Sequence, residues 1–222
     1  MKRILAIIPF VLDREVAAAH AEALNNVASA GTLITAVPLT SGPTPADYDR
    51  PDFVHATREV AEILESCQSD FDAAFISCFE DPGLEEARAI ARIPVTGPLE
   101  ATMGLVRALG EDFFLVSPDH ESEPGYRHAI GKLGAGHHFN AFETVDFEVG
   151  NADVHADAVN RIAAAILQGR TDRPNDLAIL ACTDFLRLHA DVKRMVGGRV
   201  IEPATVAVRT LEFVLDRKIK IF

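Results

Sequence analysis

Two cysteines occupy matched places in the sequence, and each closes a short apolar run that starts at an aspartate. The first run extends from Asp72 to Cys78, and the second extends from Asp176 to Cys182, 104 residues further along the chain. A run of this length is too short for a capped helix and indicates a strand buried in a parallel sheet. Open α/β sheets bind their ligands at the carboxyl ends of such strands. The repeat therefore predicts one cleft with a thiol on each wall.

Two facing thiols can form a redox disulfide, bind a metal or move protons. A metal site is disfavoured because no histidine stands at a ligand-like spacing from either cysteine. A redox pair stays open, although such pairs usually show a CxxC motif, which this chain lacks. Proton transfer on both faces of one carbon is racemase chemistry, in which one group removes a proton and the other returns it. Our hypothesis is that Cys78 and Cys182 are these catalytic groups. The alternative from another class is a two-lobed small-molecule binding protein in which the cysteines are incidental.

The chemistry is predicted to need no cofactor. The sequence has no nucleotide-binding motif, and no lysine lies in a motif suggestive of a pyridoxal Schiff base. The negative charge that develops on a substrate enolate would then have to be stabilised by backbone N–H groups and hydroxyls near the cysteines. The candidates are the amides of Phe79 and Thr183 and the hydroxyls of Thr183 and Ser117.

The residues around the two cysteines also suggest the character of the substrate. Phe10 and Phe79 are expected to form an apolar wall at the mouth of the cleft, which suits a substituted ring better than a second carboxylate. Asp184 is a further candidate for contact with substrate, and it could also tune a thiol. Glu80 and Glu100 could tune the thiols as well. All three acids could equally be ordinary carboxylates at helix N-termini.

The remaining elements that position these residues alternate between short apolar strands and longer amphipathic helices. This order predicts an α/β fold with two pseudo-symmetric doubly wound lobes, parallel sheets and the active site in the cleft between the lobes. Lobe one is expected over residues 1–98, with 206–222 packing back onto it, and lobe two over 99–205. The expected strands cover 3–8, 32–39, 73–77, 95–97, 112–118, 137–145, 177–181 and 200–201. The expected helices cover 13–30, 52–67, 82–92, 99–109, 125–133, 151–168, 185–195 and 204–215.

Composition narrows the classes of partner. The net charge of −12, with no long basic cluster, argues against nucleic acid or an anionic membrane surface. The apolar start of the chain is interpreted as a first strand rather than an export signal, since Pro9 lies within it and charged residues end it. Three cysteines without dense spacing fit a reducing cytoplasm better than a disulfide scaffold. We expect a cytoplasmic homo-oligomer with a small-molecule substrate.

Two segments resemble motifs of a known superfamily. Residues 76–84 (Ile-Ser-Cys-Phe-Glu-Asp-Pro-Gly-Leu), followed by Pro-Val-Thr-Gly at 94–97, resemble the first cysteine motif of hydantoin racemases. Ala-Cys-Thr-Asp at 181–184 resembles the second cysteine motif of aspartate and glutamate racemases. The resemblance to the Asp/Glu/hydantoin racemases implies two similar α/β lobes with the active site between them. It also implies that Cys78 and Cys182 form a two-base pair.

The sequence departs from the hydantoin racemase pattern at two places that affect the choice of substrate. Hydantoin racemases commonly have an Asn-rich loop after the first strand, where this chain has Ile-Pro-Phe-Val at 8–11. They commonly have small residues where this chain has Thr183 and Asp184. The preferred substrate is a 5-substituted hydantoin or an allantoin-like ring. The alternatives are an aspartate/glutamate-type racemase and a maleate-type cis–trans isomerase, which uses one cysteine as a nucleophile.

Overall fold

The chain folds into two compact units and crosses between them twice. The computed structural model describes residues 1–45, 50–118, 122–149, 155–217 and 219. One unit comprises Met1–Pro98 and Ala204–Phe222, and the other comprises Leu99–Pro203. Part of the predicted 40–51 loop, the first residues of the helix predicted at 151–168 and most of the 218–222 tail lie outside the described residues.

The first unit contains a four-stranded parallel sheet in the order β2-β1-β3-β4. Its strands are β1 (Lys2–Ile8), β2 (Thr32–Pro38), β3 (Ala73–Ile76) and β4 (Val95–Thr96). Its helices are α1 (Arg14–Val27), α2 (Arg50–Cys67), the 3₁₀ turn η1 (Gln68–Asp70), α3 (Leu84–Ile90) and α8 (Pro203–Asp216), which reaches this unit after the chain has left the other. Every residue of β3 is buried, as expected for a central strand covered on both faces.

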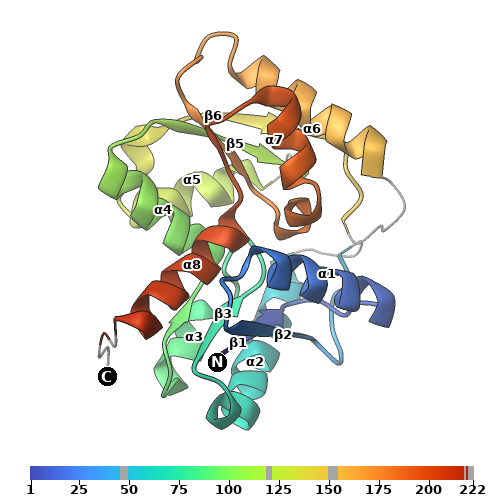
Figure 1. Ribbon diagram of the computed structural model, residues 1–222, viewed down its shortest axis with the longest axis vertical. Helices are drawn as coiled ribbons and strands as arrows, with labels where there is room; N and C mark the ends of the chain where they lie inside the picture. Colours follow the sequence, from blue (N-terminus) through green and yellow to red (C-terminus); the bar gives the residue numbers. More distant parts are fainter. Residues whose placement is uncertain (46–49, 119–121, 150–154, 218, 220–222) are drawn as a thin grey trace. The chain divides into compact units, whose positions relative to one another are not determined.

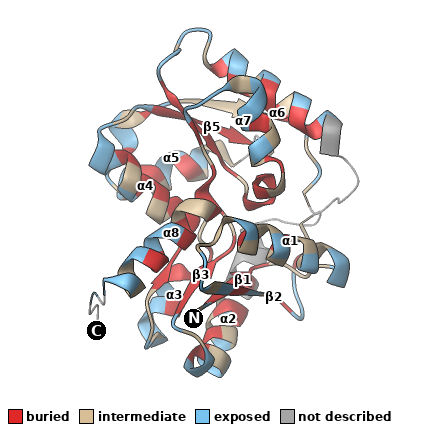
Figure 2. Cartoon of the chain, viewed as in Figure 1, coloured by how far each residue is buried: buried red, intermediate tan, exposed pale blue. Residues whose placement is uncertain are grey.

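Alternating residues of β1 and β3 point to opposite faces of this sheet and explain its layers. Leu5 and Ile7 of β1, with Ala74 and Ile76 of β3, pack in one cluster with apolar residues of α2 and α3. The intervening positions point to the other face, where α1 and α8 lie (Figure 1). β1, β3 and β4 are therefore largely buried, whereas β2 at the edge of the sheet buries only Ile34, and each helix keeps an exposed outer side (Figure 2).

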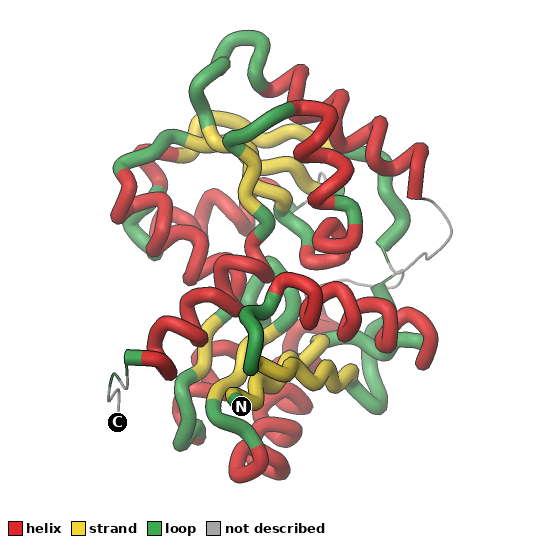
Figure 3. Tube along the Cα trace, viewed as in Figure 1, coloured by secondary structure: helices red, strands yellow, loops and turns green. Residues whose placement is uncertain are grey.

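The second unit repeats this architecture with a parallel sheet in the order β6-β5-β7-β8. Its strands are β5 (Phe113–Ser117), β6 (Phe139–Thr144), β7 (Leu177–Leu180) and β8 (Val200–Ile201). Its helical elements are α4 (Pro98–Leu109), α5 (Glu123–Lys132), η2 (Gly136–His138), α6 (His155–Gly169), η3 (Thr183–Arg187) and α7 (His189–Val196). Residues Phe114, Val116, Ala178 and Leu180 pack with α6 and α7 on one face, and α4 and α5 cover the other (Figure 3).

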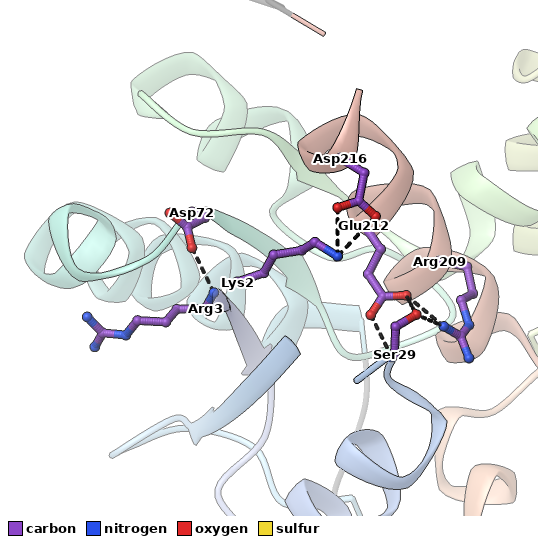
Figure 4. A network of polar contacts seen from close by, with 7 residues as sticks. All are labelled: Lys2, Arg3, Ser29, Asp72, Arg209, Glu212 and Asp216. Atoms are coloured by element: carbon purple, nitrogen blue, oxygen red, sulfur yellow. Dashed lines mark hydrogen bonds and ion pairs between the residues drawn. The ribbon is translucent and has the colours of Figure 1, made fainter. Parts of the chain in front are cut away.

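Polar contacts bind the last helix to the first unit (Figure 4). The buried carboxylate of Glu212 accepts hydrogen bonds from the backbone N–H of Ser29 at 2.7 Å and from its hydroxyl at 2.8 Å, and it also pairs with Arg209. Burial alone would raise the pKa of Glu212, but its hydrogen bonds, those with Ser29 and Arg209 among them, hold it below its ordinary value. Nearer the end of the helix, Asp216 pairs with Lys2 at the start of β1. The helix that follows β8 in sequence is thereby part of the first unit.

Several element boundaries differ from the sequence prediction. The helix after the first cysteine begins at Leu84, because Gly83 before it has a left-handed φ of 78°, so Pro82 precedes the helix instead of lying in its first turn. His137 and His138 form a 3₁₀ turn instead of starting a strand. The single helix predicted at 185–195 is divided into η3 and α7. Among the described residues, no helix is both long and apolar enough to cross a membrane.

Candidate active site

Cys78 lies in a tight turn immediately after β3. Its backbone N–H donates to the carbonyl of Ile76 at 2.9 Å, so Ser77 is the central residue of a three-residue turn. The Cys78 carbonyl accepts from the N–H of Asp81 at 3.1 Å, which closes the next turn of the loop. Cys78 is half-buried and forms no disulfide bond. Its side chain thus stands where the strand ends and the loop into α3 begins.

Cys182 has the same backbone arrangement after β7. Its N–H donates to the carbonyl of Leu180 at 2.8 Å, and its carbonyl accepts from Phe185 at 3.2 Å. Cys182 is the residue before the 3₁₀ turn η3, and it is also half-buried and forms no disulfide bond. The sequence repeat therefore corresponds to a repeated local structure in which each cysteine follows a strand and opens a helical turn.

The two turns are attached to their sheets by matching hydrogen bonds. The N–H of Ser77 donates to Ile7 of β1 at 2.7 Å, and the N–H of Ala181 donates to Val116 of β5 at 2.8 Å. β1 and β5 are the second strands in the order of their sheets. In each unit, the residue before the cysteine is thus hydrogen-bonded to the equivalent neighbouring strand. Each cysteine therefore has the same place relative to its own sheet.

The surroundings of Cys182 favour its protonated form. Burial raises the pKa of this thiol from its ordinary value of 9.0 to about 12, and the negative charges of Asp184 and Glu202 contribute to the rise. Backbone N–H groups of Asp184 and Phe185 hydrogen-bond to the sulfur and lower the pKa, but their effect is smaller than that of burial. Cys182 is therefore a neutral thiol at neutral pH, able to donate a proton.

Asp184 takes part in an ion pair beside this cysteine. Its carboxylate accepts from both Nε and a terminal nitrogen of Arg187, at 3.1 Å and 2.9 Å, and both side chains are largely buried. Arg187 is the one cation within five positions of either cysteine. Because it is paired with Asp184, a substrate carboxylate would have to compete with that acid for it.

The other predicted site residues are divided between the two units. Phe10, which follows β1, is half-buried, and Phe79 is fully buried at 1% exposure, so its ring belongs to a packed region and not to an open surface. Ser117 is the last residue of β5 and is buried, as is Thr183 directly after Cys182. The structure thus brings Phe79 together with Cys78, and Thr183 and Asp184 with Cys182. That the two groups face one cleft stays a prediction.

The third cysteine has a different environment. The Cys67 thiol donates to the carbonyl of Ile63 at 3.0 Å within α2, and the side chain packs against the apolar cluster of the first sheet. Burial raises its pKa, and the charge of Asp70 also contributes to the rise. Cys67 is accordingly a packing residue in a helix. Among the described residues, no group of three or more His, Cys, Asp or Glu could hold a metal ion.

Sequence reasoning missed two features of the first cysteine loop. Asp81 has a positive φ of 53°, a conformation that aspartate tolerates better than most residues. Its carboxyl group lies against Gly97, where a Cβ would overlap it. The Asp-Pro-Gly sequence at 81–83 signalled a turn, but nothing in the sequence indicated that Gly97 is its contact. The second feature is a buried hydrogen bond between His20 of α1 and Ser77.

Comparisons with known proteins agree on one family. The family model described as Asp/Glu/Hydantoin racemase matches residues 14–211. The hydantoin racemase of Rhizobium meliloti is 24% identical over 190 residues, which cover 85% of this chain and 79% of that protein. The hydantoin racemase of Paenarthrobacter aurescens is 24% identical over 196 residues, covering 86% and 82%. The solved structure of allantoin racemase from Klebsiella pneumoniae has a TM-score of 0.87 at 24% identity, covering 98% of this chain and 89% of that one. This structural likeness shows a shared fold.

Proposed function

The chain belongs to the Asp/Glu/Hydantoin racemase family, and on this premise we propose that it racemises an acidic carbon with Cys78 and Cys182 as the two acid/base groups. The observation that carries the proposal is the matched pair of turns. Neither cysteine forms a disulfide bond, and both follow equivalent strands and have the same backbone hydrogen bonds. A packing role would not require the second half of the chain to reproduce the position of the first thiol.

The reaction needs one thiolate and one thiol at the start. Cys78, as thiolate, takes the proton from the substrate carbon and becomes a thiol, and the electron pair of the C–H bond enters the enolate. Cys182 then gives its proton to the opposite face and becomes the thiolate. We assign Cys182 as the first donor because its raised pKa keeps it protonated. The N–H groups that hydrogen-bond to its sulfur would stabilise the thiolate once it forms.

A cyclic imide or ureide is the substrate class that the residues near the cysteines favour. The curated relatives are named hydantoin racemase, and the structural relative is named allantoin racemase. Both names describe rings with an acidic carbon beside a carbonyl group. Arg187 is the one cation within five positions of either cysteine in the sequence, and it is already paired with Asp184. This pairing disfavours a dicarboxylate substrate, which would need a cation of its own.

A panel of single-enantiomer substrates tests the proposal directly. Purified protein is incubated in D₂O with 5-substituted hydantoins, allantoin, aspartate, glutamate and maleate. Optical rotation is followed by polarimetry, and the substrate C–H signal is followed by NMR. We expect loss of rotation together with loss of the C–H signal for a hydantoin or for allantoin. Exchange with aspartate alone, or conversion of maleate without proton exchange at a stereocentre, would reverse this order of substrates.

Cysteine variants test the two-base assignment. Cys78→Ser and Cys182→Ser should each abolish racemisation, because a serine hydroxyl is too weak an acid to act as a base at neutral pH without help. Each variant retains one thiol and should still exchange the proton of one enantiomer with D₂O, with opposite preference. Cys67→Ser is the matched control and should retain turnover. If both variants exchange the same enantiomer, or if either retains full turnover, the two-base assignment is wrong.

A further inference from the structure

Each unit sends one buried side chain from the helix after its first strand to the residue that precedes the cysteine. In the first unit, Nε2 of His20 on α1 lies 2.8 Å from the Ser77 hydroxyl oxygen, and both residues are buried. In the second unit, the hydroxyl of Tyr126 on α5 donates to the carbonyl of Ala181 at 3.4 Å, also in a buried position. His20 and Tyr126 thus occupy corresponding places in the two halves.

The residue that each side chain contacts is the centre of a turn. Ser77 lies between Ile76 and Cys78, whose backbone groups are hydrogen-bonded to each other, so a rotation about the Ser77 backbone would change the direction of the Cys78 side chain. The Ser77 N–H is bonded to Ile7 of β1, and the Ser77 hydroxyl is bonded to His20 of α1. The centre of the turn is therefore held on one side by the sheet and on the other by a helix.

The two contacts differ in strength. A separation of 2.8 Å is normal for a good hydrogen bond to a hydroxyl, whereas 3.4 Å is long for a tyrosine donating to a carbonyl. The first unit uses a side-chain hydroxyl at the central position, where the second unit has an alanine and offers only its backbone carbonyl. The constraint on Cys78 is accordingly the stronger of the two.

We propose that His20 is a positioning residue for Cys78 and acts through the Ser77 hydroxyl, with Tyr126 as its weaker counterpart for Cys182. This role rests on the proposed function, because it assumes that Cys78 takes part in the reaction. A purely structural His20–Ser77 pair would contribute to stability without a selective effect on one thiol. A positioning pair, by contrast, holds one thiol in place, so its loss should alter the reactivity of that thiol alone.

The test measures the reactivity of each cysteine in the same molecule. His20→Leu and Ser77→Ala proteins are treated with iodoacetamide, and labelling of Cys78, Cys182 and Cys67 is quantified by peptide mass spectrometry. We expect labelling of Cys78 to become about fivefold faster relative to Cys67, the factor that corresponds to the net contribution of about 1 kcal/mol from one hydrogen bond. Labelling of Cys182 should not change.

Three further variants separate positioning from general loosening of the fold. His20→Gln should restore the wild-type labelling rate of Cys78, because its side-chain amide nitrogen can approach the position of Nε2. The double variant His20→Leu/Ser77→Ala should behave like either single variant, since both remove the same contact. Tyr126→Phe should accelerate Cys182 by about twofold at most, because its hydrogen bond is long, and leave Cys78 unchanged. If His20→Leu does not fold, Ser77→Ala carries the test, since it installs the residue that the second unit has.

The outcomes distinguish this inference from the proposed function. If Ser77→Ala leaves the ratio of Cys78 to Cys67 labelling unchanged, or accelerates all three cysteines alike, the positioning role is wrong whether or not the protein racemises its substrate. If Cys78 alone is accelerated but the wild-type protein exchanges no proton in the substrate panel, the positioning role stands and the proposed function fails. Where turnover is found, Ser77→Ala should lower kcat and leave KM unchanged, because the substrate-binding residues are not altered.

Discussion

Removing one negative charge near Cys182 should lower the pKa of its thiol. The rise from 9.0 to about 12 has burial as its largest cause, followed by the charge of Asp184, with a smaller contribution from Glu202. Asp184→Asn keeps the shape of the side chain and removes the charge. Charged neighbours typically shift a pKa by 1–3 units. We expect about 1 unit here, because Arg187 already pairs with Asp184 and screens its charge.

The rate of alkylation reports this change. At pH 8 a thiol of pKa about 12 is thiolate in about one molecule in ten thousand, whereas a thiol of pKa 9.0 is thiolate in roughly one in ten. A decrease of about 1 unit gives about tenfold more thiolate, but each thiolate becomes less nucleophilic, with a Brønsted coefficient of about 0.4–0.5. The net rate at Cys182 should therefore increase about threefold. In the wild-type protein, the rate should rise about tenfold per pH unit from pH 7 to 10 without a plateau.

The measurement is iodoacetamide labelling of Cys182 followed by peptide mass spectrometry, with Cys67 as the internal reference. Asp172→Asn is the matched control, because Asp172 is exposed and precedes the amino end of β7, opposite the end that carries Cys182. Glu202→Gln should have the same sign as Asp184→Asn and a smaller effect, following the order of their contributions. A plateau at Cys182 near pH 9 or below in the wild type, or an unchanged rate in Asp184→Asn, would refute the assigned causes.

Two further predictions concern the scaffold that holds the cysteines. Glu212→Gln should destabilise the protein by about 1–3 kcal/mol at pH 7 in urea unfolding, because a buried carboxylate loses charge-assisted hydrogen bonds. The control is Asp216→Asn, which removes an exposed ion pair of the same helix and should cost less than about 1 kcal/mol. Since the folded pKa of Glu212 is depressed, its contribution is present above the unfolded value near 4.5 and is lost as the pH falls through the folded pKa, so Glu212→Gln should converge toward the wild type in acid. Gly97→Ala should displace the Asp81 carboxyl group from its contact, reduce turnover and cost about 1–3 kcal/mol. The control is Gly104→Ala, on an open face of α4, which should stabilise the protein by about 0.5–1 kcal/mol and leave turnover unchanged. Equal effects of the two substitutions would contradict the contact assigned to Gly97.

The positions of the strands and of the two cysteine turns could be predicted because their causes are local. An apolar run of four or five residues between an aspartate and a cysteine is long enough to identify a buried strand, and the loop and helix that follow it set the parallel order. The helix boundaries were harder to predict. The start of α3 depends on the left-handed conformation of Gly83, where a Cβ would contact the backbone of Thr57 on another helix.

The environment of each thiol could not be predicted, because it depends on contacts between distant parts of the chain. His20 contacts Ser77, which lies 57 positions further along the sequence. The one local indication is that His20 lies on the buried side of α1 with Leu24. The N–H groups at a helix N-terminus ordinarily lower the pKa of a nearby thiol. At Cys182 the N–H groups do lower it, but burial and the charge of Asp184 outweigh them. That balance depends on how deeply the sulfur is buried, which the order of residues does not reveal.

The two thiols share a backbone arrangement, and the raised pKa of Cys182 has a consequence for the kinetics. Two free enantiomers are equally stable, so kcat/KM must be equal in the two directions, and a high pKa at Cys182 cannot appear as a directional preference of the wild-type enzyme. Under the proposed two-base mechanism, it should appear in Cys78→Ser, where Cys182 is the remaining thiol and must act as the base. Proton exchange by this variant should rise about tenfold per pH unit from pH 7 to 9, as expected for a thiol of pKa about 12. A pH-independent exchange rate in Cys78→Ser over this range would show that Cys182 ionises readily in the working enzyme and that its resting environment is not the one in which it reacts.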